Sequence, residues 1–455
     1  MSEQLVQEKV LRDPIHNFIH VQDQIILDLI NAPEFQRLRR VQQLGITSSV
    51  FHGAEHSRFG HSVGAYELAR RVTEYFNQYY SKNNGHNGCW DPAESLLTMV
   101  AALLHDVGHG AFSHTFEHLF QTDHEAMTQA IITGDTEINR ILLQQGPDFP
   151  NRVASVIAKT YPNQQVVQLI SSQLDVDRMD YLLRDAYYTG TKYGEFDIDR
   201  IMRTMRPTAQ GIGFDIRGMH AVEDYIVSRY QMYQQVYFHP VSRGMEVILE
   251  HLLHRVKELE QNQNVIEEDF VGPLLRPLFN DQPLSVDDYL RLDDHVFMTY
   301  INIWQDHPDQ ILSDLAQRFL QRRPLKSIQI NEKTAPYLDN LEKIVQKAGY
   351  NPDYYTARND AYDLPYDDYK PSDKKPRTQI DFILEDGTHQ ELSALSPLVA
   401  AIKGRASVDQ RFFFPKEMLN TGPDELFAQI HHNFRSFIKN DTLTPPGLDN
   451  KNDVN

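Results

Sequence analysis

A long apolar run followed by a polar turn stands near the middle of the N-terminal half: residues 95–114 read SLLTMVAALLHDVGHGAFSH. The run Leu96–Leu104 is apolar on every side, which predicts a central, buried helix. Just before it, Asp91-Pro92-Ala93-Glu94 has the pattern of a helix start: an N-cap acceptor, a proline and a capping-box acid. The predicted helix delivers His105 and Asp106 at its end, and the glycines that follow break it.

The His105-Asp106 pair has the chemistry of a metal site. Imidazole and carboxylate groups together bind divalent transition metals. A carboxylate at the end of an apolar helix must be paired or metal-bound, because a lone buried charge is very costly. By itself, such a pair is more typical of a buried hydrogen bond. The metal interpretation gains from His61 at the start of one predicted helix and Asp177 within another. Further polar groups follow the pair closely: His109, His114, Glu117, His118 and His124.

Six segments, in this order, resemble the HD superfamily and, more closely, its deoxynucleoside triphosphate triphosphohydrolases. They are residues 13–16 (DPIH), 34–39 (EFQRLR), 43–45 (QLG), 57–62 (SRFGHS), 104–114 (LHDVGHGAFSH) and 175–181 (DVDRMDY). The resemblance runs from about Lys9 to His239 and weakens beyond Gly244. It implies that one divalent metal is held by His61, His105, Asp106 and Asp177. Iron, manganese, nickel, zinc and magnesium all remain open for this set, which leaves coordination positions for water and a phosphate oxygen.

The resemblance also implies a reaction. Water would attack the α-phosphorus of a deoxynucleoside triphosphate and release a deoxynucleoside and intact triphosphate, with a separate Mg²⁺ on the nucleotide. His124 would protonate the leaving 5′-oxygen, while His114 and Glu117 would act on the side of attack. His109 completes the implied acid–base group. His118 is expected to be exposed or to cap a helix.

Two polar stripes are implied to line the substrate. Asp177, Tyr181 and Asp185 share one helical face, and so do Arg229, Tyr233 and Tyr237. Spacing alone fits a solvated face or a buried polar seam equally well. By resemblance, Arg58, Arg178, Arg229 and Tyr181 contact phosphates. Gln43 and Asp185 would bond the 3′-hydroxyl, and Tyr237 with Leu44 would leave no room for a 2′-hydroxyl. An ordinary core position is the alternative for Tyr237.

A second nucleotide site is implied at a subunit interface. The matching residues are Lys9, Val10, Asn31, Gln36, Arg37 and Arg39. Arginines 37, 39 and 40 form a local cation cluster that would suit a triphosphate, although an exposed helix face with charge pairs is the simpler alternative. The implied activator is a nucleotide such as dGTP or GTP, in a homotetramer. Asn31 stands where the family often has an aspartate that reads guanine, and Arg12 replaces a smaller polar residue, so activation by nucleotide in general is the firmer expectation.

Composition limits the partners and the setting. The formal net charge is −19, which argues against a general nucleic-acid or membrane-surface binder because both partners are polyanions. No run approaches the ~20 apolar residues that span a bilayer. The start of the chain lacks the apolar stretch of a signal peptide. The single cysteine, Cys89, allows no intrachain disulfide, so a cytoplasmic setting is expected.

We expect a mainly α fold: an HD-domain helical core with a smaller C-terminal α+β region. The expected parts are an N-terminal segment with the regulatory site (1–50), the catalytic core (51–320), the α+β region (321–440) and a disordered tail (441–455). Helices are predicted over 63–79, 168–188, 221–238 and 340–348. Strands are predicted over 327–330 and 378–384, and a loop over 359–375.

Three other functions fit part of the pattern. Another HD phosphohydrolase, such as a nucleotide phosphomonoesterase or an alarmone hydrolase, would use the same metal ligands without needing Gln43, Leu44 or Tyr237. A non-catalytic nucleotide sensor would need no acid–base groups beside its metal, so the extra histidines speak against it. A nuclease is the weakest option, because the acidic balance disfavours it.

Overall fold

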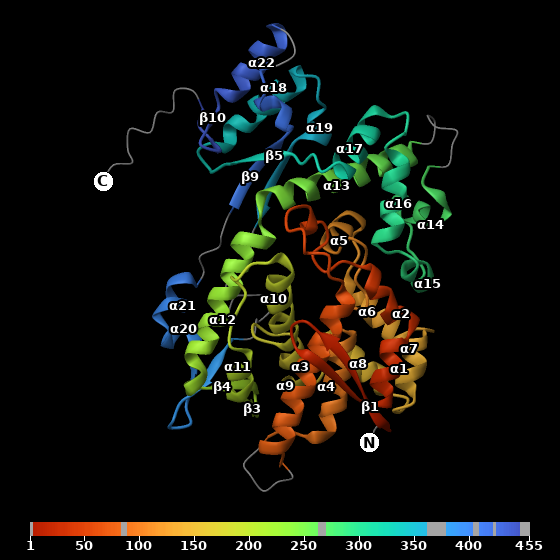
Figure 1. The fold of residues 1–455 in the computed structure, drawn as a ribbon, viewed down its shortest axis with the longest axis vertical. Helices are drawn as coiled ribbons and strands as arrows, with labels where there is room; N and C mark the ends of the chain where they lie inside the picture. The colour runs from red at the N-terminus through yellow and green to blue at the C-terminus, as the bar shows by residue number, and fades with distance from the viewer. Residues whose placement is uncertain are drawn as a thin grey trace. The chain divides into compact units, whose positions relative to one another are not determined.

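The computed structural model of the chain describes residues 3–82, 89–262, 270–361, 379–403, 409–421 and 425–445 (Figure 1). The fold is mainly helical with small sheets, which confirms the predicted class. The chain forms two compact units. The first unit comprises Met1–Tyr233, Leu284–His295 and Leu364–Arg405, and the second comprises Gln234–Pro283, Val296–Asp363 and Ala406–Asn455. The boundaries predicted at residues 50 and 320 do not coincide with these limits.

The first unit begins with an antiparallel hairpin of β1 (Gln4–Asp13) and β2 (Asn17–Asp23), and helices form most of the rest. Its helices are α1 (Gln24–Asn31), α2 (Pro33–Gln36), α3 (Arg58–Tyr79), α4 (Ser95–Leu104), α5 (His114–Phe120), α6 (His124–Thr133), α7 (Glu137–Leu143), α8 (Phe149–Ile157), α9 (Gln164–Ile170), α10 (Val176–Thr189), α11 (Ile198–Thr204), α12 (Met219–Met232), α15 (Val286–Leu290), α20 (Leu392–Leu395) and α21 (Pro397–Ile402).

Helix α4 is the centre of the first unit, as predicted from its apolar run. Nearly all of its side chains are buried, and it packs against α3, α8 and α9 (Figure 1). The predicted start is also correct, since the Asp91 carboxylate accepts a hydrogen bond from the backbone N–H of Ala93. Helix α3 in turn packs against α10. These three helices carry the groups of the candidate site.

The predicted helix over 168–188 is broken in the structure. Helix α9 ends at Ile170 and α10 begins at Val176. Between them, the Asp175 carboxylate accepts hydrogen bonds from the backbone N–H groups of Ser172 and Arg178, both at 2.7 Å. A capping aspartate satisfies amides that a new helix start would leave without partners. The break places Asp177 in the first turn of α10.

A four-stranded sheet brings part of the C-terminal region into the first unit. Its order is β3 (Met205–Thr208), β4 (Gly211–Asp215), β7 (Asp381–Ile383) and β8 (His389–Glu391). Strand β7 pairs in parallel with β4, with Phe382 opposite Phe214. The predicted strand over 378–384 is therefore present in part, but it belongs to the first unit rather than to a separate C-terminal region.

The second unit combines helices with a five-stranded sheet in the order β10-β11-β5-β9-β6. Its helices are most of α16 (Asp294–Trp304) with α13 (Pro240–Gln261), α14 (Gly272–Phe279), α17 (Gln310–Leu320), α18 (Leu338–Lys347), α19 (Pro352–Tyr355) and α22 (Glu425–Arg435). Its strands are β5 (Lys326–Gln329), β6 (Ala357–Ala361), β9 (Asp409–Phe414), β10 (Ile438–Lys439) and β11 (Thr442–Leu443).

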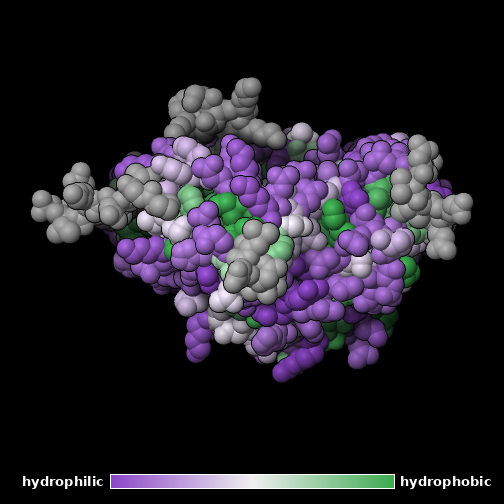
Figure 2. All heavy atoms as spheres, turned by 90° about the horizontal axis from the view of Figure 1, so that it is seen from above, coloured by the Kyte–Doolittle hydropathy of each residue, from purple (hydrophilic) through white to green (hydrophobic). Residues whose placement is uncertain are grey.

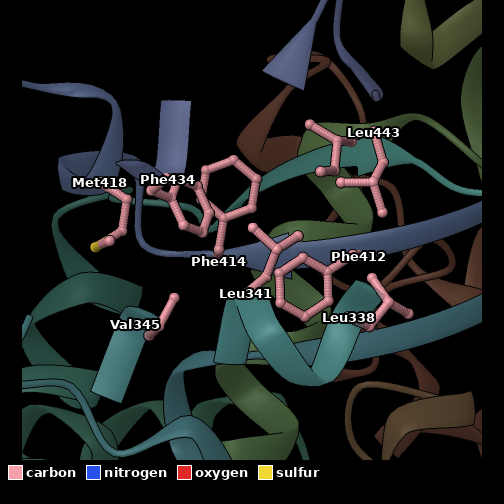
Figure 3. Close-up of a cluster of buried hydrophobic side chains, with 9 residues drawn as sticks. Leu338, Leu341, Val345, Phe412, Phe414, Met418, Phe434 and Leu443 are labelled. Carbon is pink, nitrogen blue, oxygen red and sulfur yellow. The ribbon is translucent and has the colours of Figure 1, made fainter. Parts of the chain in front are cut away.

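An apolar core joins this sheet to α18 and α22. Figure 3 shows Phe412 and Phe414 of β9 with Leu341 and Val345 of α18 and Phe434 of α22, and all of these side chains are fully buried. The predicted strand 327–330 and helix 340–348 correspond to β5 and α18. Burial of large apolar side chains on one face of the sheet is what stabilises this small α+β fold.

Two predictions for irregular chain need correction. Residues 359–361, expected in a loop, belong to β6, because their backbone pairs with β9. The remainder of that loop, 362–375, lies outside the described residues. The tail expected to be disordered from residue 441 contains β11, which pairs with β10 and β5. Residues 446–455 lie outside the described residues.

The surface of the protein is mainly polar. Figure 2 shows a face that is hydrophilic over most of its area, with small, separated hydrophobic patches. Among the described residues, no helix combines the length and apolar content that crossing a membrane requires.

Candidate metal centre

Three helix ends bring the predicted metal ligands together. His61 lies in the first turn of α3, His105 follows the last residue of α4, and Asp177 lies in the first turn of α10. Because α3 packs against both α4 and α10, these ends meet. His61 is 1% exposed, while the Asp177 side chain keeps 27% of its surface open to solvent. The cluster is therefore buried on one side and accessible on the other.

The donor atoms converge on one point. The Nε2 atoms of His61 and His105 are 3.2 Å apart, and Oδ1 of Asp177 lies 3.2 Å from the first and 3.5 Å from the second. Asp106 lies beside these three residues, with Oδ1 3.4 Å from Nε2 of His105 and Oδ2 3.7 Å from Nε2 of His61. Ligands bonded to one metal at about 2.0–2.2 Å are separated from one another by roughly 3–3.5 Å. The residues present thus fit a single divalent ion.

Outer hydrogen bonds fix which ring nitrogen faces this point. Nδ1 of His61 contacts the Asp180 carboxylate at 2.8 Å, and Nδ1 of His105 donates to the carbonyl oxygen of Ala102 at 2.8 Å. Both imidazoles therefore present Nε2 to the centre, as metal-bound histidines do. Two opposed ring nitrogens at 3.2 Å need a proton or a cation between them, which the ion would supply.

The electrostatics of the cluster also favour a positive charge. Burial alone would lower the pKa of His61, but hydrogen bonds with Asp177 and Asp180 outweigh it and raise the pKa to about 10. Burial would raise the pKa of Asp177, but contacts with His105 and His61 hold it well below the usual range. Both shifts show that the carboxylates gain from a cation at this place.

A buried network supports His61 from behind. Asp180 accepts hydrogen bonds from Arg184 and contacts Nε2 of His16 at 2.7 Å, and Arg184 also pairs with Asp13. Sequence reasoning gave Asp180, His16 and Arg184 no role, although all but Arg184 lie in segments that carry the family resemblance. The i,i+4 spacing of Asp180 and Arg184 on α10 could have indicated this ion pair in advance, because buried charges require partners of opposite charge.

Asp106 connects the predicted metal ligands to the predicted acid–base group. Its Oδ1 atom lies 3.2 Å from Nε2 of His109, and its Oδ2 atom pairs with Arg58. Arg58 also donates to Oγ of Ser113 at 2.8 Å. The structure thus places Arg58, the predicted phosphate contact, beside Asp106 at the edge of the cluster.

A second cluster consists of His109, Glu117 and His124. Oε1 of Glu117 lies 2.6 Å from Nδ1 of His124, and the ring of His124 stacks on that of His109 with centroids 3.9 Å apart and planes 13° apart. In-plane lone pairs of two parallel rings do not converge on one ion. This arrangement therefore fits proton transfer better than a second metal.

The two stacked histidines have opposite pKa shifts. Burial and the Arg58 charge lower the pKa of His109 to about 3. Burial would also lower the pKa of His124, but the hydrogen bond with Glu117 outweighs it and raises the pKa. His109 is thus neutral near pH 7, whereas His124 retains its proton more strongly. His114 begins α5, and its side chain lies outside the described residues. His118 is exposed, as expected.

Gly108 shapes the turn between the two clusters. A Cβ atom at this position would lie 2.3 Å from the backbone nitrogen of Thr128 and 2.4 Å from the carbonyl oxygen of His124. Such contacts are impossible without backbone movement, so glycine is required for the turn to pack against α6. This close packing brings His124 over His109.

Comparison with known proteins agrees with this geometry. Residues 58–185 match the HD domain, and residues 196–270 match the HD-associated region. The protein YwfO of Bacillus subtilis is 47% identical over 420 residues, which cover 92% of this chain and 94% of YwfO. The chain belongs to the HD-domain phosphohydrolase family. Its donor set and family together indicate a divalent metal site.

Two other proteins are similar to this chain at lower sequence identity. The crystal structure of a phosphohydrolase from Bacteroides thetaiotaomicron is similar with a TM-score of 0.75 and 28% identity, covering 90% of this chain and 100% of that one. A protein of Dictyostelium discoideum, named as a homologue of the deoxynucleoside triphosphate triphosphohydrolase SAMHD1, is 29% identical over 53% of this chain and 48% of its own length.

Besides Arg58 on α3, the predicted phosphate-binding residues lie on two other helices of the first unit. Arg178 and Tyr181 are on α10, and Arg229 is on α12, where its guanidinium lies 5.6 Å from the centre of the Tyr233 ring. Arg178 pairs with Asp175, and its buried Nε has no hydrogen-bond partner among the described residues. Burial raises the pKa of Tyr181 well above its usual range, so its hydroxyl stays neutral.

The residues predicted to contact the sugar belong to both units: Gln43, Leu44 and Asp185 to the first, and Tyr237 to the second. Gln43 and Leu44 are half-buried in the first unit. Asp185 is buried and lies 2.8 Å from Nε2 of His56, a residue that sequence reasoning missed. Tyr237 ends a π-helical turn over Tyr233–Tyr237 that follows α12, and it belongs to the second unit. Its contact with the sugar stays a prediction.

The residues predicted for the regulatory site differ in their exposure to solvent. Lys9, Val10, Asn31 and Arg39 are exposed, and Arg39 donates to the Gln36 side chain at 2.9 Å. The guanidinium of Arg39 lies 3.5 Å above the Phe59 ring.

Arg37 does not share this exposed surface. It is 1% exposed and donates to two backbone carbonyls. Arg37 therefore does not form an exposed cation cluster with Arg39 and Arg40, because successive side chains of a tight helical turn point in different directions. Its contact with a nucleotide stays a prediction.

Proposed function

We propose that this protein hydrolyses deoxynucleoside triphosphates to a deoxynucleoside and inorganic triphosphate. The observation that carries the proposal is the position of Asp106, which contacts both His105 and His109. A phosphate held at the metal ligands would therefore lie within reach of the acid–base group. Metal-dependent phosphohydrolysis needs these two functions side by side.

Residues of the chain supply the proton transfers. A bound metal would act as a Lewis acid on the α-phosphate. The oxygen of water forms a bond to the α-phosphorus, and the bond from phosphorus to the 5′-oxygen breaks. Glu117 or His114 takes a proton from the water, and His124 gives one to the 5′-oxygen. Glu117 supports the second step because it raises the pKa of His124.

Cationic and hydroxyl groups suit the polyphosphate. Arg178 and Arg229 would pair with phosphate oxygens, and Tyr181 and Tyr233 would donate hydrogen bonds. Mg²⁺ would accompany the nucleotide, as it does for most triphosphates. The metal ligand Asp177 precedes Arg178 directly on α10, so the metal and a phosphate-binding cation are presented by the same helical turn.

Recognition of the deoxyribose is proposed for Gln43, Leu44, Asp185 and Tyr237. Oε1 of Gln43 is buried and has no hydrogen-bond partner among the described residues. Buried acceptors of this kind require a donor, which the 3′-hydroxyl would provide. Tyr237 and Leu44 would exclude a 2′-hydroxyl by contact with C2′. The name of the Dictyostelium relative supports this substrate class.

Nucleotide activation is part of the proposal. Lys9, Val10, Asn31, Gln36 and Arg39 would hold a nucleotide such as dGTP or GTP between subunits of a homotetramer. The exposure of Arg39 beside Gln36 supports a role in binding a ligand or partner. A cytoplasmic setting would supply both substrate and activator.

Product analysis tests the proposal. Each deoxynucleoside triphosphate is incubated alone and in pairs, with Mg²⁺ and Mn²⁺ present. Deoxynucleoside and intact triphosphate are the expected products, with stimulation by a second nucleotide. Monophosphate with pyrophosphate, or stepwise loss of phosphate, would assign the protein to another class of HD phosphohydrolase. No turnover under any pairing would refute the enzymatic proposal.

A further inference from the structure

We infer that His56 is a positioning residue for recognition of the 3′-hydroxyl, acting through both Asp185 and Gln43. The inference rests on the proposed function, in which these two residues bind that hydroxyl. No role for His56 follows from the metal site or from proton transfer. His56 is distinguished by two hydrogen bonds: its side chain bonds to Asp185, and its backbone carbonyl bonds to Gln43.

The side chain of His56 fixes the Asp185 carboxylate. Its Nε2 atom lies 2.8 Å from Oδ1 of Asp185. His56 is 7% exposed and Asp185 is 1% exposed, so this hydrogen bond is shielded from water. A charge-assisted bond in such surroundings is strong and directional. It leaves the carboxylate with a set orientation on α10.

The imidazole itself is held in place. Its ring stacks on that of Tyr188, with centroids 4.5 Å apart and planes 11° apart. Nδ1 of His56 is buried and has no hydrogen-bond partner among the described residues, which favours the tautomer with the proton on Nε2. That tautomer makes His56 the donor and Asp185 the acceptor.

The backbone of His56 fixes Gln43. Its carbonyl oxygen accepts a hydrogen bond from the backbone N–H of Gln43 at 2.9 Å. The neighbouring residues Gln42 and Ser57 form an antiparallel β-bridge, so the two segments are joined at adjacent positions. Movement of His56 would therefore displace both groups that are proposed to contact the same hydroxyl.

This arrangement separates the sugar end of the site from the metal end. Asp177 and Asp185 lie on one face of α10, eight residues apart, which is about 12 Å along the helix axis. Loss of the His56 hydrogen bond should therefore weaken discrimination at the sugar more than metal binding. Sites that bond a substrate hydroxyl reject analogues lacking it, provided that their polar groups are well placed.

The test compares a deoxynucleoside triphosphate with its 2′,3′-dideoxy counterpart, which lacks only the 3′-hydroxyl. His56→Phe keeps a ring that can stack on Tyr188 but removes the donor, and His56→Gln keeps an N–H donor without the ring. His52→Phe is the matched control, because His52 is an exposed histidine of the same segment. The readout is the ratio of kcat/KM for the two substrates, with metal content and Tm recorded for every variant.

We expect His56→Phe to reduce the ratio on the order of ten-fold, the effect of losing one hydrogen bond to a charged group. His56→Gln should recover much of it, and His52→Phe should leave it unchanged. An unchanged ratio in folded His56→Phe would overturn the inference, as would a native enzyme that does not distinguish the substrates. If His56→Phe does not fold, His56→Asn, whose shorter amide cannot reach Asp185, replaces it. A native protein that hydrolyses neither substrate would refute the proposed function itself.

Discussion

Arg37 donates hydrogen bonds from Nη1 to the carbonyl oxygen of His109, at 2.9 Å, and from Nε to that of Leu292, at 2.8 Å. Its buried guanidinium thus joins the turn that carries His109 to the segment Leu284–His295 of the same unit. Asp294 supports that turn too, by accepting a hydrogen bond from the backbone N–H of Phe112 at 2.9 Å. Phe112 and Ser113 have φ values of 52° and 50°, which side-chain-bearing residues rarely adopt. The hydrogen bonds from Arg37 and to Asp294 hold the turn in this left-handed backbone conformation.

Arg37→Lys should therefore destabilise the protein. A lysine keeps the charge, but its single ammonium group cannot match the planar fork that reaches two carbonyls. We expect the free energy of unfolding of the first unit to fall by about 2–3 kcal/mol, the cost of leaving a buried acceptor unsatisfied. Chemical denaturation measures it. Arg39→Lys, at an exposed position, is the control and should change the stability by less than about 0.5 kcal/mol. Equal stability of both variants would contradict the structural role of Arg37.

Arg39→Ala tests the regulatory site. Because Arg39 is exposed beside Gln36, its removal should reduce the stimulation by added nucleotide several-fold while basal turnover changes little. Activity is measured with and without the activating nucleotide. Lys159→Ala is the control, since Lys159 is an exposed cation outside the predicted nucleotide site and pairs with Glu125. Loss of basal turnover alone in Arg39→Ala would refute the second nucleotide site.

The sequence predicted two features of the first unit best: the central helix and the cluster of histidine and aspartate side chains. The all-round apolar run before His105 predicted a central helix, and α4 is that helix. The order of His61, His105, Asp106 and Asp177 predicted a cluster that the structure brings together within hydrogen-bonding distances. Such a cluster can be recognised in the sequence because each position needs a particular chemical group at the end of a helix.

Other features depend on long-range packing that no local pattern encodes. The burial of Arg37 depends on the segment around Leu292, more than 250 positions away in the chain. The pairing of β7 with β4 likewise joins residues that the predicted domain boundaries had separated. His56 was overlooked because a lone histidine in a short connection carries no periodic signal, and only the contact with Asp185 shows its role.

His105→Ala should remove the metal and the activity together. The substitution deletes one of the converging donors and leaves the Ala102 carbonyl without its imidazole partner. We expect metal content to fall to near zero after dialysis and turnover to fall by at least about 1,000-fold. Elemental analysis and product assays measure the two effects. His118→Ala, at an exposed histidine nearby, should retain both. Activity in metal-free His105→Ala would contradict the metal assignment.

Glu117→Gln should shift the pH dependence of turnover. The Glu117 carboxylate raises the pKa of His124, so in the native enzyme the acid form of His124 persists to higher pH. An amide carries no charge, and the pKa of His124 should fall. If His124 donates the proton to the 5′-oxygen, the alkaline limb of kcat/KM moves to lower pH in the variant. Profiles for both proteins, taken at equal metal loading, measure the shift. An unchanged alkaline limb, or one that moves to higher pH, would exclude His124 as the acid.

Tyr237→Ala tests how ribonucleotides are rejected. A ring under C2′ would exclude the 2′-hydroxyl by contact alone, and such contact discriminates against an added atom by roughly 10- to 200-fold. Removing the ring should raise kcat/KM for ribonucleoside triphosphates relative to their deoxy counterparts by about that factor. Tyr237→Phe, which keeps the ring and loses only the hydroxyl, should reject ribonucleotides as the native enzyme does. If Tyr237→Ala keeps full selectivity while it remains folded, the ring serves packing within the second unit, and the selectivity for deoxyribose must come from residues of the first unit such as Leu44 and Gln43.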